Sequence, residues 1–380
     1  MYRRGKPGVQ RAAGSLHLAL VVALVTVSGM AFTAALAGPL QQPESVHLPH
    51  VLVVATGGTI ASRASSPEQL SGYRVADTGE DLVTAVPAIA DVAKVTVEQY
   101  SNVGSTSLTP ADWLKIAQLI NKALEGAGGH DEFGDVDGVV VTHGTDALEE
   151  TAFFLNLTVR SRKPVVVVGA MRPASAISAD GPLNLLNAIR VAAEPASRER
   201  GVMVILNQEI NAARDVTKNN TKLVQTFVSR SLGLLGIVDN DQVLFYRRSE
   251  RRHTYQSEID VAELTPDDLP RVDISYTYGG SDGADVDAFV AKGARGIVVA
   301  TAGAGATTRG QGQALRRAAE QGVLVVRSSR TGSGRVGGGR GRGRTVGADD
   351  LNPQKARILL MLALTVTDDP AEIQRFFDTY

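Results

Sequence analysis

The chain of 380 residues contains no cysteine and only six histidines. The absence of thiols excludes disulfide bonds and cysteine ligands, so the fold has to be held by its hydrophobic core. The histidines are scattered and form no HExxH pattern, which argues against a metal site built on imidazoles. A site made of carboxylates alone stays open.

An excess of one charge is also lacking. The formal net charge is −1, with 21% charged and 43% hydrophobic residues, which is ordinary for a globular protein. No strong field points to a nucleic acid or to an anionic membrane surface, so we expect neither as a partner. The length is sufficient for two domains.

One long apolar run is present, at residues 16–37, and basic residues precede it at positions 3, 4, 6 and 11. The run ends in Ala35-Leu36-Ala37, the small-x-small pattern of a secretory cleavage site. We interpret residues 1–37 as a signal peptide and expect an exported protein, periplasmic or secreted, with no stable membrane association after cleavage. The alternative is an uncleaved anchor, because the run is long enough to span a bilayer.

Short runs rich in valine recur along the chain, as is typical of strands buried on both faces of a parallel sheet. They lie at residues 51–55, 139–141, 165–169, 202–206, 296–300 and 323–327. Helical patterns alternate with them, which predicts an α/β chain with open, mostly parallel sheets. The polar stretch 247–271 is interpreted as a linker between a larger N-terminal α/β domain, residues 48–246, and a smaller α/β C-terminal domain, residues 272–380. Asn352 and Pro353 are expected to start a helix in the latter.

The first valine-rich strand is followed by Thr56-Gly57-Gly58-Thr59. Ligands of open parallel sheets bind beyond the carboxyl ends of the strands, and Gly57 and Gly58 permit a tight turn and a close approach of a ligand to backbone N–H groups. Thr59 would present a hydroxyl there. The plain alternative is a strand–helix turn with a threonine cap.

The second strand ends in His143-Gly144-Thr145-Asp146. Asp146 followed by Glu149 has the pattern of a capping box for a helix over 147–157, which would explain the aspartate without any chemistry. We expect His143 to make structural hydrogen bonds rather than to act as a base. Lys218 lies in the polar run 213–221, where most lysines are simply solvated.

Taken together, Thr59, Thr145, Asp146 and Lys218 supply two hydroxyls, a carboxylate and an amine, the groups used for nucleophilic attack on an amide or ester. With these residues, the chain resembles the bacterial type II L-asparaginases and the related glutaminase-asparaginases over about residues 51–380. The motifs that carry the resemblance are "ATGGTIAS" 55–62, "THGTDALEETAFFL" 142–155, "VVVVGAMRPASAISADGPLNLLNA" 165–188, "ARDVTKNNTK" 213–222, "RSSRTGSG" 327–334 and "LNPQKARILL" 351–360.

The resemblance implies hydrolysis of L-asparagine to L-aspartate and ammonia, with some glutaminase activity, no organic cofactor and no metal. It also implies a homotetramer whose sites lie at the interface of intimate dimers. Its implied catalytic residues are Thr59 as nucleophile, Tyr73 on a mobile loop, and Thr145, Asp146 and Lys218. Its implied substrate-binding residues are Gly58, Ser105, Thr106, Thr145 and Asp146, with Ser105 on the α-carboxylate and Asp146 on the α-ammonium.

The order of proton transfers follows from simple electrostatics. A threonine hydroxyl is a poor nucleophile and needs a base. A carboxylate beside Lys218 would stabilise the charged ammonium and make it a poor base, so we expect Tyr73 or a water to take the first proton from Thr59. Backbone N–H groups of Gly58 and Thr145 are candidates for an oxyanion hole. Which threonine becomes acylated stays open.

Two departures from the family pattern affect substrate binding. Thr106 stands where relatives commonly carry Gln or Glu. The segment that usually supplies an acidic side chain to the neighbouring subunit is replaced here by "GRVGGGRGRGR", residues 334–344, which we expect to be a mobile loop. Asp349 and Asp350 are the nearest candidates for the missing acid.

Three alternatives remain. Residues 334–344 have the composition of an RGG-like nucleic-acid segment. The altered segment also suits a catalytically weak amino-acid binding protein on the same fold. A hydrolase of another small amide or ester is the third, because fold does not fix substrate.

Overall fold

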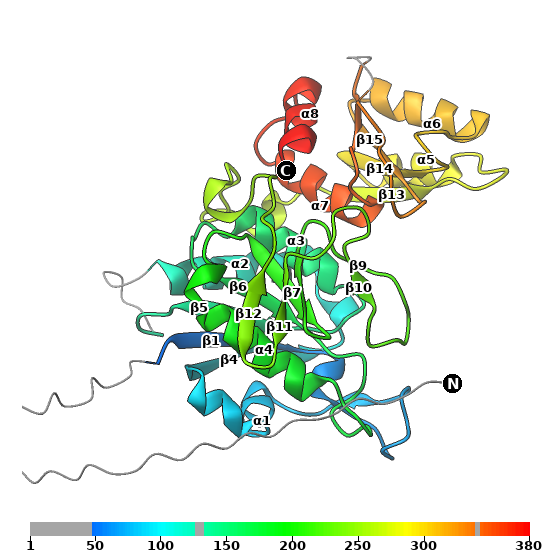
Figure 1. Ribbon diagram of the computed structural model, residues 1–380. Coiled ribbons are helices and arrows are strands. Elements are labelled where there is room, and N and C mark those ends of the chain that lie inside the picture. Colours follow the sequence, from blue (N-terminus) through cyan, green and yellow to red (C-terminus); the bar gives the residue numbers. More distant parts are fainter. Residues whose placement is uncertain (1–47, 126–132, 339–342) are drawn as a thin grey trace, which may run out of the picture. The chain divides into compact units, whose positions relative to one another are not determined.

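The computed structural model describes residues 48–125, 133–338 and 343–380, so the expected signal peptide at 1–37 lies outside the described residues (Figure 1). The larger sheet has eight strands in the order β12-β11-β8-β7-β6-β5-β1-β4. Strands β4, β1, β5, β6 and β7 run parallel, and β8, β11 and β12 extend the sheet in antiparallel fashion. Their bounds are β1 His50–Gly57, β4 Lys94–Val103, β5 Gly138–Thr142, β6 Val165–Val168, β7 Val202–Leu206, β8 Glu209–Ala212, β11 Gly236–Asp239 and β12 Gln242–Phe245.

Both faces of the central strands are buried, as the valine runs predict. In β1, Leu52 and Val54 belong to one hydrophobic core, and Val51 and Val53 belong to another. Successive side chains of a strand point to opposite faces, so this alternation puts one core on each side of the sheet. Helices α2 Pro110–Leu124 and α3 Leu148–Thr158 pack on the first core, and α1 Gly79–Thr84 and α4 Gly181–Ala193 on the second.

The smaller sheet is parallel throughout, in the order β13-β14-β15-β16, with bounds Val272–Tyr276, Gly296–Thr301, Leu324–Ser329 and Thr345–Gly347. Helices α5 Ala284–Ala291 and α6 Arg309–Glu320 cover one face (Figure 1). Helices α7 Pro353–Ala363 and α8 Pro370–Thr379 follow. The expected start of α7 is confirmed, because the Asn352 side chain accepts a hydrogen bond from Lys355 N–H and Pro353 is the first helical residue. The predicted α/β class and its division into a large and a small sheet are therefore confirmed.

Residues 247–271 contain only the 3₁₀ turns η5 Thr254–Gln256 and η6 Pro266–Asp268, but they are fixed to the protein. Ile259 and Val261 are fully buried in the core that also contains α3 and α7. The Ser257 hydroxyl donates to the Leu157 carbonyl at 2.5 Å. The connection is thus packed on the protein at residues 253–261 but largely exposed at 262–268, and the domain limits given above stay predictions.

Short elements connect the strands of the large sheet, and of these η2 and η4 precede the amino ends of β4 and β7. The short elements are η1 Thr59–Ala61, β2 Ser62–Arg63, β3 Arg74–Val75, η2 Pro87–Asp91, η3 Ser105–Ser107, η4 Pro195–Ser197, β9 Thr217–Lys218 and β10 Phe227–Val228. Among the residues that the structure describes, no helix combines the length and apolarity needed to cross a membrane.

Candidate active site

The turns after β1 and β5 meet at one edge of the sheet. The two strands are parallel neighbours, with Ala55 paired to Thr142, so both turns leave the sheet side by side. Gly58 has φ 86°, and a Cβ added there would lie 2.3 Å from both the N and Cα atoms of Gly144. The close neighbour of this glycine is the backbone of the other turn, and the expected close approach of a ligand stays a prediction. Thr59 and Thr145 each follow one of the two touching glycines.

Thr59 forms a pair with Tyr73. The side chain of Thr59 is buried, and its Oγ1 lies 3.1 Å from the Tyr73 hydroxyl, with either atom able to donate. Tyr73 belongs to the connection between β2 and β3, which pair antiparallel through Ser62 and Val75. The alternative of Thr59 as a helix cap is wrong, because Gly58 is the N-cap of η1 and no side chain caps it.

Thr145, Asp146 and Lys218 form a second group. Lys218 lies in β9, which pairs antiparallel with β10. Its ammonium donates to Thr145 Oγ1 at 2.9 Å and to Asp146 Oδ1 at 2.6 Å. The Lys218 side chain is 15% exposed, whereas the Asp146 side chain is 71% exposed. The lysine is thus enclosed between the threonine and the carboxylate, and the carboxylate itself faces solvent.

The capping-box prediction for Asp146 and Glu149 is wrong. Helix α3 begins at Leu148, its N-cap is Ala147, and no side chain caps it. The Asp146 carboxylate binds the Lys218 ammonium instead, since a full positive charge outcompetes a neutral N–H group. Ala147 N–H donates to the hydroxyl of Ser105 at 3.3 Å.

Ser105 and Thr106 differ in their surroundings. Ser105 is buried, and a Cβ added to Gly144 would lie 3.0 Å from its hydroxyl, so it stands next to the two touching turns. Thr106 is exposed, and its hydroxyl has no hydrogen-bond partner among the described residues. The structure therefore brings Ser105 to the site and leaves Thr106 at its surface.

The two candidate oxyanion donors also differ. Gly58 N–H donates to the Val103 carbonyl at 3.0 Å, and this bond occupies the proton that the oxyanion role requires. That role does not fit the structure. Thr145 N–H has no acceptor among the described residues, so it remains the candidate donor.

His143 is a structural residue, as predicted. It is fully buried, and burial lowers the pKa of its imidazole to about 4. A neutral ring fits its contacts: Nδ1 donates to the Gly144 carbonyl at 2.7 Å, and Nε2 accepts from the Thr151 hydroxyl at 2.8 Å. The ring braces the turn that carries Thr145.

The start of the Gly-Arg segment is anchored, contrary to the prediction of a mobile loop over all of 334–344. Val336 is 4% exposed, and its backbone exchanges hydrogen bonds of 2.8 and 3.1 Å with Asp349. Arg335 also forms an ion pair with the Asp349 carboxylate. Residues 339–342 lie outside the described residues.

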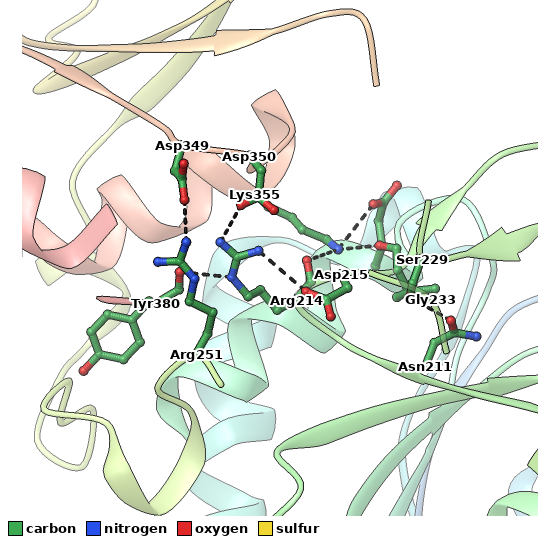
Figure 2. A network of polar contacts seen from close by, with 12 residues as sticks. Asn211, Arg214, Asp215, Ser229, Gly233, Arg251, Asp349, Asp350, Lys355 and Tyr380 are labelled. Atoms are coloured by element: carbon green, nitrogen blue, oxygen red, sulfur yellow. Dashed lines mark hydrogen bonds and ion pairs between the residues drawn. The ribbon is translucent and has the colours of Figure 1, made fainter. Parts of the chain in front are cut away.

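Asp349 and Asp350 are engaged within their own chain. Arg251 lies 2.5 Å from the Asp349 carboxylate, and Arg214 lies 2.7 Å from that of Asp350 (Figure 2). The Arg214 partner holds the pKa of Asp350 below its ordinary value against the opposing effect of its burial. Both carboxylates therefore already have counter-ions, which argues against their replacing the family's missing acid.

Sequence reasoning missed two buried groups behind the site, Glu149 and Lys355. The Glu149 carboxylate accepts from Thr217, the residue next to Lys218, and the Lys355 ammonium lies 3.8 Å from it. The sequence alone indicates Glu149 only as a capping residue and Lys355 only as a member of the "LNPQKARILL" motif. Both lie in the polar first turn of their helices, near Glu150 and Arg357, so no local pattern marks them as buried.

Two hydroxyls with separate proton partners, an enclosed lysine and an exposed carboxylate lie at the edge of a parallel sheet, and these are the groups that nucleophilic attack on an amide or ester uses. Comparison with known proteins identifies the family. Residues 50–251 match the family model "Asparaginase, N-terminal", and residues 271–377 match "Glutaminase/Asparaginase C-terminal domain". The chain belongs to the asparaginase family of amidohydrolases.

Named relatives extend over almost the whole chain. An L-asparaginase 2 from Bacillus subtilis (strain 168) is 46% identical over 340 residues, which cover 89% of this chain and 88% of the relative. A probable periplasmic L-asparaginase from Haemophilus influenzae is 43% identical, covering 88% and 93%. The crystal structure of a probable cytoplasmic L-asparaginase from Campylobacter jejuni matches with a TM-score of 0.82 and 43% identity, covering 87% of this chain and all of that one. The resemblance to type II asparaginases is confirmed.

Proposed function

We propose that this protein is an exported asparaginase that uses a threonine nucleophile to convert L-asparagine to L-aspartate and ammonia, with minor glutaminase activity. The observation that carries the proposal is the contact between Gly58 and Gly144, which sets two hydroxyls, each with its own proton partner, at one sheet edge. Asparagine as substrate is supported by the family and by the names of the relatives.

In the proposed reaction, Thr59 Oγ1 attacks the amide carbon of the substrate while its proton passes to Tyr73 or a water. The carbonyl oxygen becomes an oxyanion, for which Thr145 N–H is the candidate donor. The C–N bond then breaks and ammonia leaves with an added proton, giving a threonine ester. Water hydrolyses this ester, releases aspartate and restores the hydroxyl. Lys218 and Thr145 would pass protons and stabilise charge near the leaving group.

The substrate's α-amino and α-carboxylate groups would bind at the outer side of the site. Asp146 suits the α-ammonium, because one of its oxygens binds Lys218 and the carboxylate is 71% exposed. Ser105 suits the α-carboxylate, with Gly58, Thr106 and Thr145 around it. Thr106 is the residue at which we expect the preference between asparagine and glutamine to be set, since it stands exposed where relatives carry a longer side chain.

Export and assembly complete the proposal. Export is supported by the apolar run at 16–37 with its Ala-Leu-Ala end, and by a relative named as periplasmic. We propose a homotetramer of two intimate dimers with sites at the dimer interface, on the resemblance to type II asparaginases. Neither a cofactor nor a metal enters the proposed chemistry.

A substrate panel with ammonia detection tests the proposal on residues 38–380. We expect turnover of asparagine, weaker turnover of glutamine, and a loss on the order of a thousandfold in kcat for Thr59→Ala and for Thr145→Ala, with circular dichroism unchanged. Thr59→Ser is the matched control, because it keeps the hydroxyl. Binding of asparagine without ammonia release would favour the binding-protein alternative, and normal turnover by both alanine variants would remove this site from consideration.

A further inference from the structure

A second lysine lies behind the segment that carries Lys218. Lys355 extends from α7, and its side chain is 2% exposed. Its ammonium donates to the Arg214 carbonyl at 2.8 Å (Figure 2). It also donates to the Val216 carbonyl. Both carbonyls belong to the four residues that precede Lys218, so this one side chain fixes the backbone leading into β9.

Glu149 holds the same segment from the side of α3. Its buried carboxylate accepts from the Thr217 hydroxyl at 3.0 Å, and Thr217 is the neighbour of Lys218. The start of α7 supplies three further contacts to this carboxylate, from Asn352 at 3.0 Å, Gln354 at 3.2 Å and Lys355 at 3.8 Å. Two secondary-structure elements distant in sequence therefore converge on the residue beside Lys218.

Stability alone does not account for such a pair. Burial lowers the pKa of Lys355 from its ordinary value of 10.5 to about 8, which shows how unfavourable the environment is for an ammonium. Replacing a buried ion pair by well-packed apolar side chains is often neutral or stabilising. What an apolar pair could not do is donate to two carbonyls and accept from a threonine on one segment.

We propose that Glu149 and Lys355 are positioning residues that hold Thr217 and the start of β9, so that the Lys218 ammonium stays within hydrogen-bond distance of Thr145. The inference rests on the role of Lys218 in the proposed function. Neither side chain forms a hydrogen bond or ion pair with Thr59, Tyr73 or Thr145, so they act through the segment. Through this pair, a helix of the smaller domain supports the site of the larger one.

Thr217 gives the sharpest test, because its hydroxyl is the link between Glu149 and the Lys218 strand. Thr217→Val keeps the β-branched shape and removes only that hydroxyl, and Thr217→Ser keeps it. We expect Thr217→Val to lower kcat about tenfold, the effect of one lost hydrogen bond, with KM for asparagine within about twofold of wild type. Thr217→Ser should stay near wild type. Ser105 lies outside this segment, and the Asp146 carboxylate, which is 71% exposed, keeps an oxygen for the substrate beside the one that binds Lys218, which is why KM should hold.

A second set of variants separates positioning from stability. Lys355→Met leaves the Glu149 charge buried without a counter-ion, so its Tm should fall; adding Glu149→Gln removes that charge and should recover part of the Tm. The kcat of the double variant, measured well below both melting temperatures, should stay low, because the carbonyls of residues 214 and 216 still lack their donor. Leu360→Ala is the matched control. It lies in α7 against Gly296 of β14, so it should lower Tm without changing kcat.

The outcomes are distinguishable. Wild-type kcat in Thr217→Val, or a kcat that recovers with Tm in the double variant, overturns the positioning role. Lys218→Met tells this failure from that of the proposed function. If Lys218→Met keeps wild-type kcat, the assigned role of Lys218 is wrong; if it is inactive while Thr217→Val is normal, only the positioning inference fails. Should Lys355→Met not fold, the Thr217 pair decides alone.

Discussion

Gly58→Ala measures how much the proposed chemistry depends on the contact between the two turns. Gly58 has φ 86° and ψ −171°, a conformation essentially confined to glycine, and strain of this kind costs about 1–3 kcal/mol in other residues. The new Cβ would also lie 2.3 Å from backbone atoms of Gly144, which cannot move aside as a flexible side chain could. Overpacking of this kind costs about 1–3 kcal/mol. We therefore expect a loss of about 2–6 kcal/mol in the free energy of unfolding.

The same clash should separate Thr59 from Thr145. A displacement on the order of 1 Å of reacting groups can cost about a hundredfold in rate, so we expect kcat for asparagine to fall on that scale in the fraction of Gly58→Ala that is folded. Gly280→Ala is the control, because Gly280 has φ 89° and no atom within 4 Å of an added Cβ. It should show the backbone strain in denaturant unfolding and leave ammonia release unchanged. Equal losses of activity in both variants, or none in Gly58→Ala, would refute the reasoning.

Three further predictions concern charge. The pKa of Lys355 is lower in the folded than in the unfolded chain, so between about pH 8 and 10.5 the unfolded chain binds more protons at this residue. The difference in free energy of unfolding between wild type and Lys355→Met should therefore rise, in favour of the wild type, across that pH range. The charged groups that act on this lysine are Glu149, Arg214, Asp215 and Asp350. If urea unfolding showed the same difference in free energy between wild type and Lys355→Met from about pH 8 to pH 10.5, this prediction would be contradicted. Asp146→Asn should raise KM for asparagine and lose the discrimination against an analogue without the α-amino group; unchanged discrimination would remove Asp146 from substrate binding. Replacing residues 337–344 with a glutamate-bearing loop should lower KM for asparagine, while a Gly-Ser loop of equal length should not; a KM unchanged by both would argue that no acidic contact is missing.

The sequence predicts the central strands of the large sheet well and the strands toward its two edges poorly. The valine runs that form β1, β5, β6 and β7 are buried on both faces, so a continuous apolar pattern identifies them. Strand β4 is missed because it lies at the edge of the sheet and none of its residues is fully buried, so polar and apolar residues mix along it. The antiparallel strands β8, β11 and β12 have only four residues each, too few to show a pattern.

For the site, the motifs identify which residues take part but not how the turns and lysines meet. The pairs formed by Thr59 with Tyr73 and by Lys218 with Thr145 agree with the expectation from the family resemblance. The contact between Gly58 and Gly144 joins two backbones, so no side-chain pattern encodes it. Lys355 meets Glu149 only because α7 packs on α3, which depends on the tertiary fold rather than on any local spacing.

The first turn of α3 shows why local rules fail at this site. Asp146 and Glu149 have the spacing of a capping box, and neither carboxylate caps the helix; each binds a lysine from a distant segment. A carboxylate bond to a backbone N–H at an N-cap is charge-assisted too, but the Lys218 ammonium adds a second full charge, which favours the ion pair for Asp146. The consequence is functional under the proposed reaction. Asp146 holds the Lys218 ammonium at Thr145, whose N–H has no acceptor among the described residues and lies just before a helix end that favours negative charge.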